Sequence, residues 1–145
     1  MKKIKQIVPI LLFAMLMMGI ACACSDDIDI KQDYEFKVIH LPVPKRLVYG
    51  ETAEIRCRLV RNGNFKDTEY YFRYFQPDGK GRLRMDNGTI MAPNDSYKLV
   101  KDIFNLYYTS LSQDHQVIDV YFYDSFEKEF KLSFSFNNEN EKEGK

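Results

Sequence analysis

The sequence has no tryptophan and few thiol or imidazole groups, with three Cys and two His in 145 residues. Cys22 and Cys24 stand at the end of an apolar leader, so only Cys57 lies in the body of the chain. This distribution excludes a disulfide framework, as well as the paired cysteines and core tryptophan of antibody domains. Cys57 alternates in phase with Ile55 and Leu59, which predicts a small buried hydrophobe; a bond to Cys24 is the alternative.

Familiar catalytic signatures are missing as well. The sequence contains no G-x-S-x-G elbow, P-loop, H-E-x-x-H or C-x-x-C motif. His40 and His115 are far apart, and a lone histidine is more often solvated than catalytic. Ser112 and Asp114 are too close to His115 in sequence for a catalytic triad, whose members come from separate elements. We therefore expect no enzymatic activity, no metal site and no cofactor.

The charge balance excludes another class of function. The chain carries 21 Lys and Arg and 21 Asp and Glu. Three of the lysines lie in the leader, so residues 24–145 keep 18 positive and 21 negative side chains, a net charge of −3. Direct nucleic-acid binding depends on cations that neutralise phosphates. We expect no such binding, because the sequence shows no basic stripe.

The N-terminus has the pattern of a removable signal peptide. Lys2, Lys3 and Lys5 precede an uncharged apolar run over residues 7–20. As a helix this run would span about 21 Å, which is short of the ~30 Å hydrocarbon core of a bilayer. A short apolar run after lysines that ends in small residues predicts a leader over residues 1–23.

The residues around the cleavage point predict a lipoprotein. Small residues directly before Cys24 favour lipid attachment to Cys24, with Cys22 as second choice and cleavage by ordinary signal peptidase as the alternative. Residues 24–32 are acidic and predict a flexible tether, or a signal for export to the cell surface. We expect a membrane-anchored protein of the cell envelope. The outer membrane is favoured over the inner one, with the domain either in the periplasm or exposed on the cell surface.

The rest of the chain reads as strands. Residues 52–60, 103–110, 116–124 and 126–136 alternate between apolar and polar side chains, and residues 34–41, 68–76 and 80–85 are rich in aromatic and β-branched residues or follow turn signals. Strands at such spacing, without an amphipathic helix, predict an immunoglobulin-like antiparallel β-sandwich of about seven strands over residues 33–137. A small barrel is the alternative. We expect a hairpin turn at Pro77-Asp78-Gly79 and a disordered polar tail over 138–145.

Tyrosine clusters offer candidate binding surfaces. Residues 70–75 place large side chains on both faces of one strand, so one face must lie outside the core. Tyr and Arg dominate binding hot spots, which makes Tyr71, Arg73, Tyr107 and Tyr121 a possible protein-interaction surface. Rings also stack on sugars, and tyrosines often cover a sheet edge with only their hydroxyls in water.

Several segments in order resemble one known family. They are Glu54-Ile55-Arg56-Cys57, Arg73-Tyr74-Phe75-Gln76 before Asp78-Gly79, Pro93-Asn94-Asp95 with Tyr97, Leu106-Tyr107-Tyr108-Thr109-Ser110 and Asp119-Val120-Tyr121. Together they resemble the TraQ family of conjugative-transposon proteins over about residues 30–137. The stretch from Tyr123 to Glu127 differs, because the family has a glycine after the phenylalanine, and this leaves the shape of the last hairpin open.

The resemblance implies a non-enzymatic envelope component of a conjugative transfer apparatus. Its role would be structural or adaptor-like, and its partners would be other proteins of that apparatus rather than the transferred DNA. No functional residue is established for the family, so the resemblance assigns none. The alternative is a surface glycan-binding or adhesin module, which the tyrosine-rich strands and the acidic tether would suit.

Overall fold

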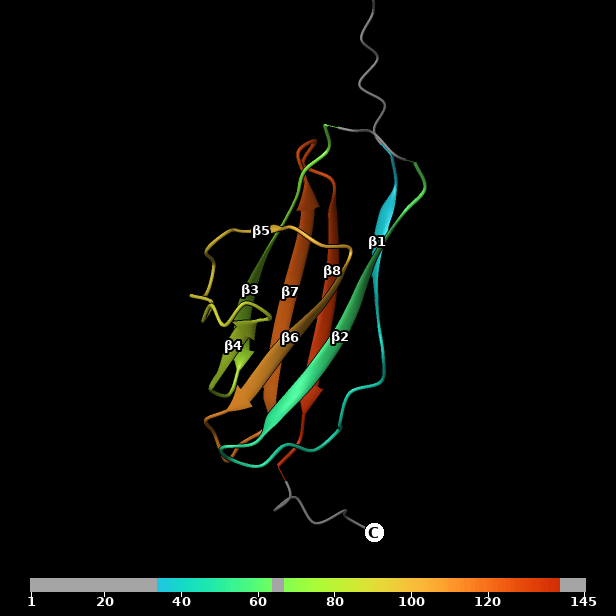
Figure 1. The fold of residues 1–145 in the computed structure, drawn as a ribbon. Helices are drawn as coiled ribbons and strands as arrows, with labels where there is room; N and C mark the ends of the chain where they lie inside the picture. The colour runs from blue at the N-terminus through green and yellow to red at the C-terminus, as the bar shows by residue number, and fades with distance from the viewer. Residues whose placement is uncertain (1–33, 64–66, 139–145) are drawn as a thin grey trace, which may run out of the picture. The chain divides into compact units, whose positions relative to one another are not determined.

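The computed structural model describes residues 34–63 and 67–138. This part of the chain is built from β-strands, which form two four-stranded antiparallel sheets. Figure 1 shows one sheet crossing in front of the other. The strands are Phe36–His40 (β1), Thr52–Arg61 (β2), Tyr70–Asp78 (β3), Gly81–Met85 (β4), Tyr97–Leu99 (β5), Ile103–Ser110 (β6), Gln116–Asp124 (β7) and Glu129–Phe136 (β8).

The strand order confirms the immunoglobulin-like sandwich. One sheet has the order β1-β2-β6-β4 and the other β5-β3-β7-β8. Without β5, these are the ABED and CFG sheets of the seven-strand constant-type immunoglobulin arrangement. The short β5 is an addition to the edge of β3, formed after the turn at residues 93–95. The sequence pattern does not predict β5, because three residues are too few to show an alternation of apolar and polar side chains.

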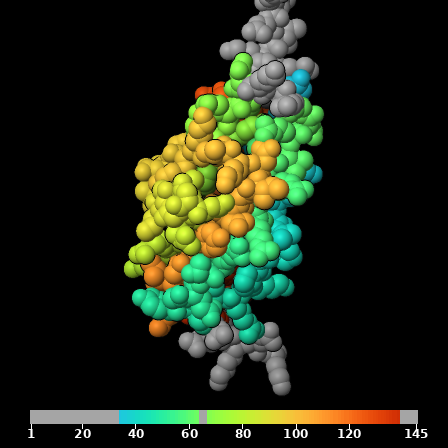
Figure 2. Space-filling view, in the orientation of Figure 1, coloured from blue at the N-terminus to red at the C-terminus, as the bar shows by residue number. Residues whose placement is uncertain are grey.

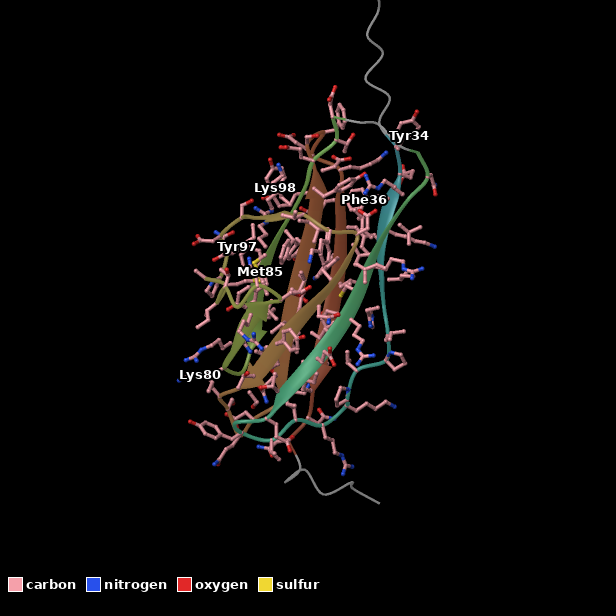
Figure 3. All side chains as sticks on the ribbon, in the orientation of Figure 1. Tyr34, Phe36, Lys80, Met85, Tyr97 and Lys98 are labelled. Atoms are coloured by element: carbon pink, nitrogen blue, oxygen red, sulfur yellow. The ribbon has the colours of Figure 1, made fainter. Side chains whose placement is uncertain are left out.

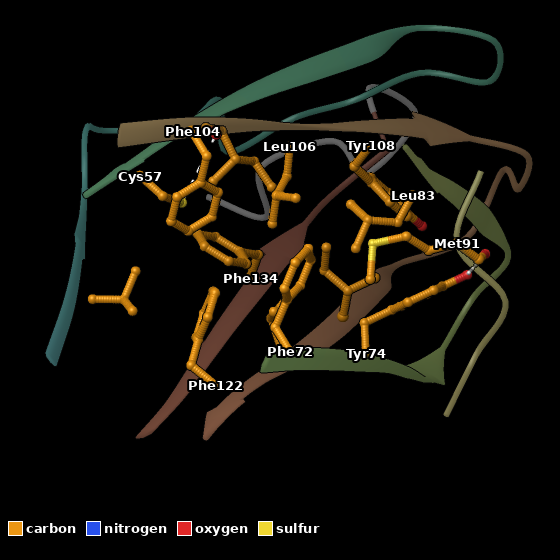
Figure 4. Close-up of a cluster of buried hydrophobic side chains, with 14 of the residues drawn as sticks. Cys57, Phe72, Tyr74, Leu83, Met91, Phe104, Leu106, Tyr108, Phe122 and Phe134 are labelled. Atoms are coloured by element: carbon orange, nitrogen blue, oxygen red, sulfur yellow. Dashed lines mark hydrogen bonds between the residues drawn. The ribbon is translucent and has the colours of Figure 1, made fainter. Parts of the chain in front are cut away.

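The inward residues of both sheets fill a core rich in aromatic rings. In β2 the buried residues alternate with exposed ones, and the same period recurs in β3 and β6. Phe72, Phe104 and Phe122 meet at the centre, with ring centroids 5.7 to 6.1 Å apart, as Figure 4 shows. Each of these residues is at most 6% exposed, so each contributes a few kcal/mol to folding, of the order lost when a buried Phe is replaced by Ala.

The predicted hairpin at Pro77-Asp78-Gly79 is wrong. Gly79 does have the left-handed φ of 73° that a turn requires, but the turn carries the chain from one sheet to the other. β3 pairs with β7 along most of its length and with β5 at residues 70–72, whereas β4 pairs with β6 in the other sheet. The sequence shows turn chemistry but not whether the flanking strands pair.

A close approach fixes the start of β4. A Cβ on Gly81 would lie 2.1 Å from the hydroxyl oxygen of Tyr108, a side chain that is fully buried. The Tyr108 hydroxyl accepts a hydrogen bond from Gln76 Nε2 at 2.6 Å and donates to Gln116 Oε1 at 2.8 Å. The tyrosine therefore joins residues of both sheets, and only glycine fits beside it.

Both edges on the β4–β5 side are short or covered. The segment after β4 turns back, so that Met91 N donates to Leu83 O and Met85 N donates to Thr89 O, at 2.9 Å each. Ile90 forms an isolated antiparallel bridge with Arg84. On the opposite sheet, β5 covers only three residues of β3.

The last hairpin keeps a left-handed turn without glycine. Glu127, the residue after Phe126, has a φ of 66°. Asp124 Oδ1 accepts hydrogen bonds from the backbone of Phe126 and Lys128, both at 2.9 Å. The hairpin therefore forms, with an unfavourable conformation at Glu127.

Candidate interaction surfaces

Three of the four predicted surface residues lie together on the outer face of the β5-β3-β7-β8 sheet. Tyr71 is opposite Tyr123 and Arg73 is opposite Tyr121 in the pairing of β3 with β7. The rings of Tyr71 and Tyr123 stack with centroids 5.8 Å apart and planes at 21°. We call this outer surface of β3, β7 and β8 the aromatic face.

The polar groups at one end of the aromatic face bind one another. The Tyr71 hydroxyl donates to Glu69 Oε2 at 2.6 Å, and Lys98 Nζ donates to Glu69 Oε1 at 2.5 Å. The hydrogen bond from Lys98 is the main reason that the pKa of Glu69 lies below its usual value, and the hydrogen bond from Tyr71 is the second. The bond to Glu69 likewise raises the pKa of Tyr71. These hydrogen bonds therefore fix the orientation of the Tyr71 side chain.

Arg73 is held at the centre of the aromatic face. Its guanidinium carbon lies 5.9 Å from the ring centroid of Tyr121 and 5.6 Å from that of Tyr123. A guanidinium nitrogen also lies 3.6 Å from a carboxylate oxygen of Glu129. Beside it, Lys131 pairs with Asp119 at 3.1 Å. Arg73 and Lys131 thus each have a carboxylate partner within the domain. These contacts hold the two side chains in place in the absence of a binding partner.

Tyr107 lies on the other side of the molecule. It projects from β6 on the outer face of the β1-β2-β6-β4 sheet, opposite Glu54 of β2 and Arg84 of β4. The guanidinium carbon of Arg84 stands 4.5 Å above its ring centroid. The four predicted residues therefore do not form one surface. Periodicity groups residues within a strand, but it does not tell which sheet a strand joins.

The face around Tyr107 carries an excess of positive charge that the sequence analysis missed. Its outward cations come from three strands, whereas its outward carboxylate is Glu54. The cations are Lys37, Arg56, Arg58, Arg82 and Arg84. The expectation that the domain lacks a basic stripe is wrong for this surface, which we call the basic face. Figure 2 shows the molecule from the side of β2 and β6.

A hollow opens between the sheets on the β4–β5 side. It has a volume of about 200 Å³. Phe72, Phe104 and Leu106 line it from the core, and Met85 and Lys98 line it from the two edges. Figure 3 shows Met85 and Lys98 on this side of the sandwich. The lining is mostly apolar, and its one carboxylate, Asp86, has no His, Ser or Cys beside it among the lining residues.

His115 joins two elements rather than standing alone in solvent. Its Nδ1 lies 3.0 Å from Asp78 Oδ2, and its Nε2 lies 2.7 Å from Ser135 Oγ. The hydrogen bond with His115 holds the pKa of Asp78 below its usual value. The hydrogen bonds link an Asp to a His and the His to a Ser, as in a catalytic triad. Ser135 lies at an exposed strand position. It lines neither the hollow described above nor a second hollow formed by Gly79, Lys80 and residues 111–114. We therefore interpret the contact as a clamp between the end of β3 and β8.

The other candidate groups have structural environments. The His40 ring packs edge-on against Phe134, with centroids 4.9 Å apart. Cys57 is a free, buried thiol, and burial raises its pKa to about 12. Within the described ranges, no three His, Cys, Asp or Glu side chains are grouped so as to hold a metal ion.

The predicted membrane attachment falls on other residues. The leader over 1–23, Cys22, Cys24 and the tether over 24–32 lie outside the described residues. In the part that is described, no helix has the length and apolarity needed to cross a bilayer. At the C-terminus the described part includes Asn138, which is buried and donates Nδ2 to the backbone oxygen of Gln113; residues 139–145 lie outside it.

Comparisons with known proteins agree on one family. The family described as TraQ conjugal transfer protein matches residues 6–139. A lipoprotein from Bacteroides thetaiotaomicron, solved by solution NMR, is 57% identical, with a TM-score of 0.69 over 81% of this chain and 91% of its own. No curated protein matches significantly.

Two further solved structures are named for conjugative transposons. The crystal structure of a conjugative transposon lipoprotein from Bacteroides eggerthii is 44% identical, with a TM-score of 0.69 over 73% of this chain and all of its own. The solution structure of residues 27–141 of a conjugate transposon protein from Bacteroides vulgatus is also 44% identical, with a TM-score of 0.67 over 82% of this chain and 97% of its own. The family match spans nearly the whole chain, and this chain therefore belongs to the TraQ conjugal transfer protein family.

Proposed function

We propose that this protein is a non-enzymatic structural or adaptor component of a conjugative transfer apparatus in the cell envelope. Its membership of a conjugal transfer family carries the proposal. One relative is named a conjugative transposon lipoprotein and another a lipoprotein, which supports a membrane-anchored envelope location. The role rests on contacts with other proteins of the apparatus, not with the transferred DNA.

The test of this role is transfer itself. The gene is deleted from a transmissible element, and donor-to-recipient transfer frequency is measured with and without a wild-type copy supplied in trans. We expect transfer to fall on deletion and to recover on complementation. Unchanged transfer after deletion would remove the proposal.

The anchor is assigned to Cys24, exposed as the new N-terminus when residues 1–23 are removed, with Cys22 as second choice. Labelling cells with a clickable palmitate analogue distinguishes the two sites. Cys24→Ser should abolish the label while Cys22→Ser keeps it, and the reverse result would move the anchor to Cys22. Gradient separation of the membranes tests the proposed outer-membrane location.

The aromatic face suits a protein partner. Tyr71, Arg73 and Tyr121 are residue types that dominate binding hot spots, and here they are held in place by stacking and hydrogen bonds. Such preorganisation lowers the entropic cost of binding. Tyr71→Ala with Tyr121→Ala should lower transfer, whereas Tyr49→Ala, at an exposed position in the loop between β1 and β2, should not and serves as the control.

The non-enzymatic reading has a test of its own. If His115 only clamps two elements together, His115→Gln should leave transfer unchanged wherever the protein remains folded by circular dichroism. Loss of transfer in a folded, normally abundant His115→Gln protein would argue for chemistry at Ser135 and Asp78. The glycan-binding alternative has less support, because the rings of Tyr71 and Tyr123 stack on each other.

A further inference from the structure

The outer faces of the two sheets differ in how their charges are paired. On the aromatic face Arg73 and Lys131 each have a carboxylate partner, and so does Lys98 on the adjoining strand β5. On the basic face Arg56 pairs with Glu54 at 3.2 Å, and both side chains stay exposed, at 61% and 39%. The other four cations of the basic face form no ion pair within the described residues. The basic face thus offers positive charge that the domain itself does not neutralise.

Exposed aliphatic side chains lie among these cations. In the pairing of β1, β2 and β6, Arg58 stands between Ile39 and Ile103. The two isoleucines are 46% and 63% exposed, although neighbouring inward residues of the same strands are buried. Cations mixed with exposed aliphatic residues are typical of surfaces that lie on anionic membranes, where the aliphatic side chains enter the boundary between headgroups and acyl chains.

The chain itself brings this face close to a membrane. In sequence, the segment after Cys24 is followed by β1, an edge strand of the β1-β2-β6-β4 sheet that carries the basic face. From Cys24 to Phe36 there are twelve residue steps, which reach at most about 40 Å when fully extended. A lipid on Cys24 would therefore hold β1 within that distance of the bilayer and raise the effective concentration of its surface.

We propose that the basic face docks the domain onto the anionic surface of the membrane that carries its lipid anchor. This rests on the lipid anchor of the proposed function. Lys37, Arg58, Arg82 and Arg84 bind lipid phosphates, Ile39 and Ile103 enter the headgroup layer, and the aromatic face on the opposite side of the sandwich stays open to protein partners. A DNA duplex also presents phosphates to the cations, as lipid headgroups do, but it offers no apolar layer for Ile39 and Ile103 to enter.

Vesicle binding tests this docking without the anchor. Residues 25–145 are used unlipidated, since residues 27–141 of the Bacteroides vulgatus relative were solved on their own. Cosedimentation compares vesicles of neutral phosphatidylcholine with vesicles in which about a third of the lipid is phosphatidylglycerol. We expect binding to the anionic vesicles that weakens as salt rises.

Paired variants place the binding on one face. Each basic residue near an anionic bilayer contributes about fivefold in affinity, so Arg58→Gln with Arg82→Gln should weaken binding roughly 25-fold. Arg73→Gln with Lys131→Gln changes the net charge equally on the aromatic face and should leave binding unchanged. Ile103→Ser should weaken the binding that remains at high salt.

Three outcomes would overturn the docking proposal: no preference for anionic vesicles, equal weakening by both pairs of variants, or tighter binding of duplex DNA or polyglutamate than of vesicles. The gene-deletion test is independent of all three. If the protein is required for transfer but does not bind anionic vesicles, the docking proposal is wrong and the proposed function still holds.

Discussion

Replacing Glu127 by glycine should stabilise the protein. Glu127 has a φ of 66°, which costs an L-residue roughly 1–2 kcal/mol. Glycine adopts this conformation freely but has more freedom to lose from the unfolded chain, an opposing effect of about 0.5–1 kcal/mol. The exposed Glu127 side chain forms no hydrogen bond or ion pair within the described residues, so nothing else is lost. The net gain should be about 0.5–1 kcal/mol.

Urea unfolding at 25 °C, followed by far-UV circular dichroism, measures this gain. The midpoint should rise while the slope with urea stays constant, since the surface exposed on unfolding is unchanged. In a thermal melt the same gain corresponds to roughly 2–8 °C for a domain of this size. Refolding must be reversible for the comparison to hold.

Two matched variants separate backbone strain from other causes. Glu127→Ala removes the same charge but keeps a Cβ, so its stability should stay near that of the wild type. Asn94 has a φ of 67°, and Asn94→Ala should destabilise, because asparagine tolerates this region better than alanine. If Glu127→Ala gains as much as Glu127→Gly, or if Glu127→Gly is no more stable than the wild type, the strain argument is wrong.

Gly81→Ala should destabilise by about 1–3 kcal/mol, because its Cβ would lie 2.1 Å from the buried Tyr108 hydroxyl; urea unfolding checks this, and a loss under 0.5 kcal/mol would contradict it. Cys57, with a pKa of about 12, should not react with Ellman's reagent at pH 8 until urea unfolds the protein, since its thiolate fraction is only about one in ten thousand; rapid native labelling would show that the thiol is accessible. The lowered pKa of Asp78 means that its contact with His115 stabilises the fold above the ordinary value of 3.8 and that this is lost as pH falls through the lowered value. The stability difference between wild type and Asp78→Asn should therefore shrink in acid, and a difference that grows there would refute the assignment.

The alternating strands were the most predictable part of the fold. The ranges of β6 and β7 match the predicted 103–110 and 116–124, because one apolar and one polar face give each strand an unambiguous period of two. The three-residue β5 has no such pattern. The pairing of β4 was mispredicted because a Pro-Asp-Gly turn specifies a local reversal of the chain but not the sheet that the next strand joins.

The same limit explains the candidate surfaces. Tyr71, Arg73 and Tyr121 could be chosen from composition and phase, but their separation from Tyr107 depends on which sheet each strand enters. The basic face depends on the placement of Arg82 and Arg84 beside β6, which the expected hairpin with β3 would have put elsewhere. The net charge of a chain does not report such segregation.

The short and covered strand edges have a consequence for crowding. Unpaired edges invite identical chains to pair and aggregate, and proteins confined to a lipid surface meet their own copies often. On one side of the sandwich, β5 offers three residues and β4 is bridged by Ile90. At high local concentration, neighbouring copies should therefore not pair edge to edge along that side. Many copies could then lie close together as separate folded domains.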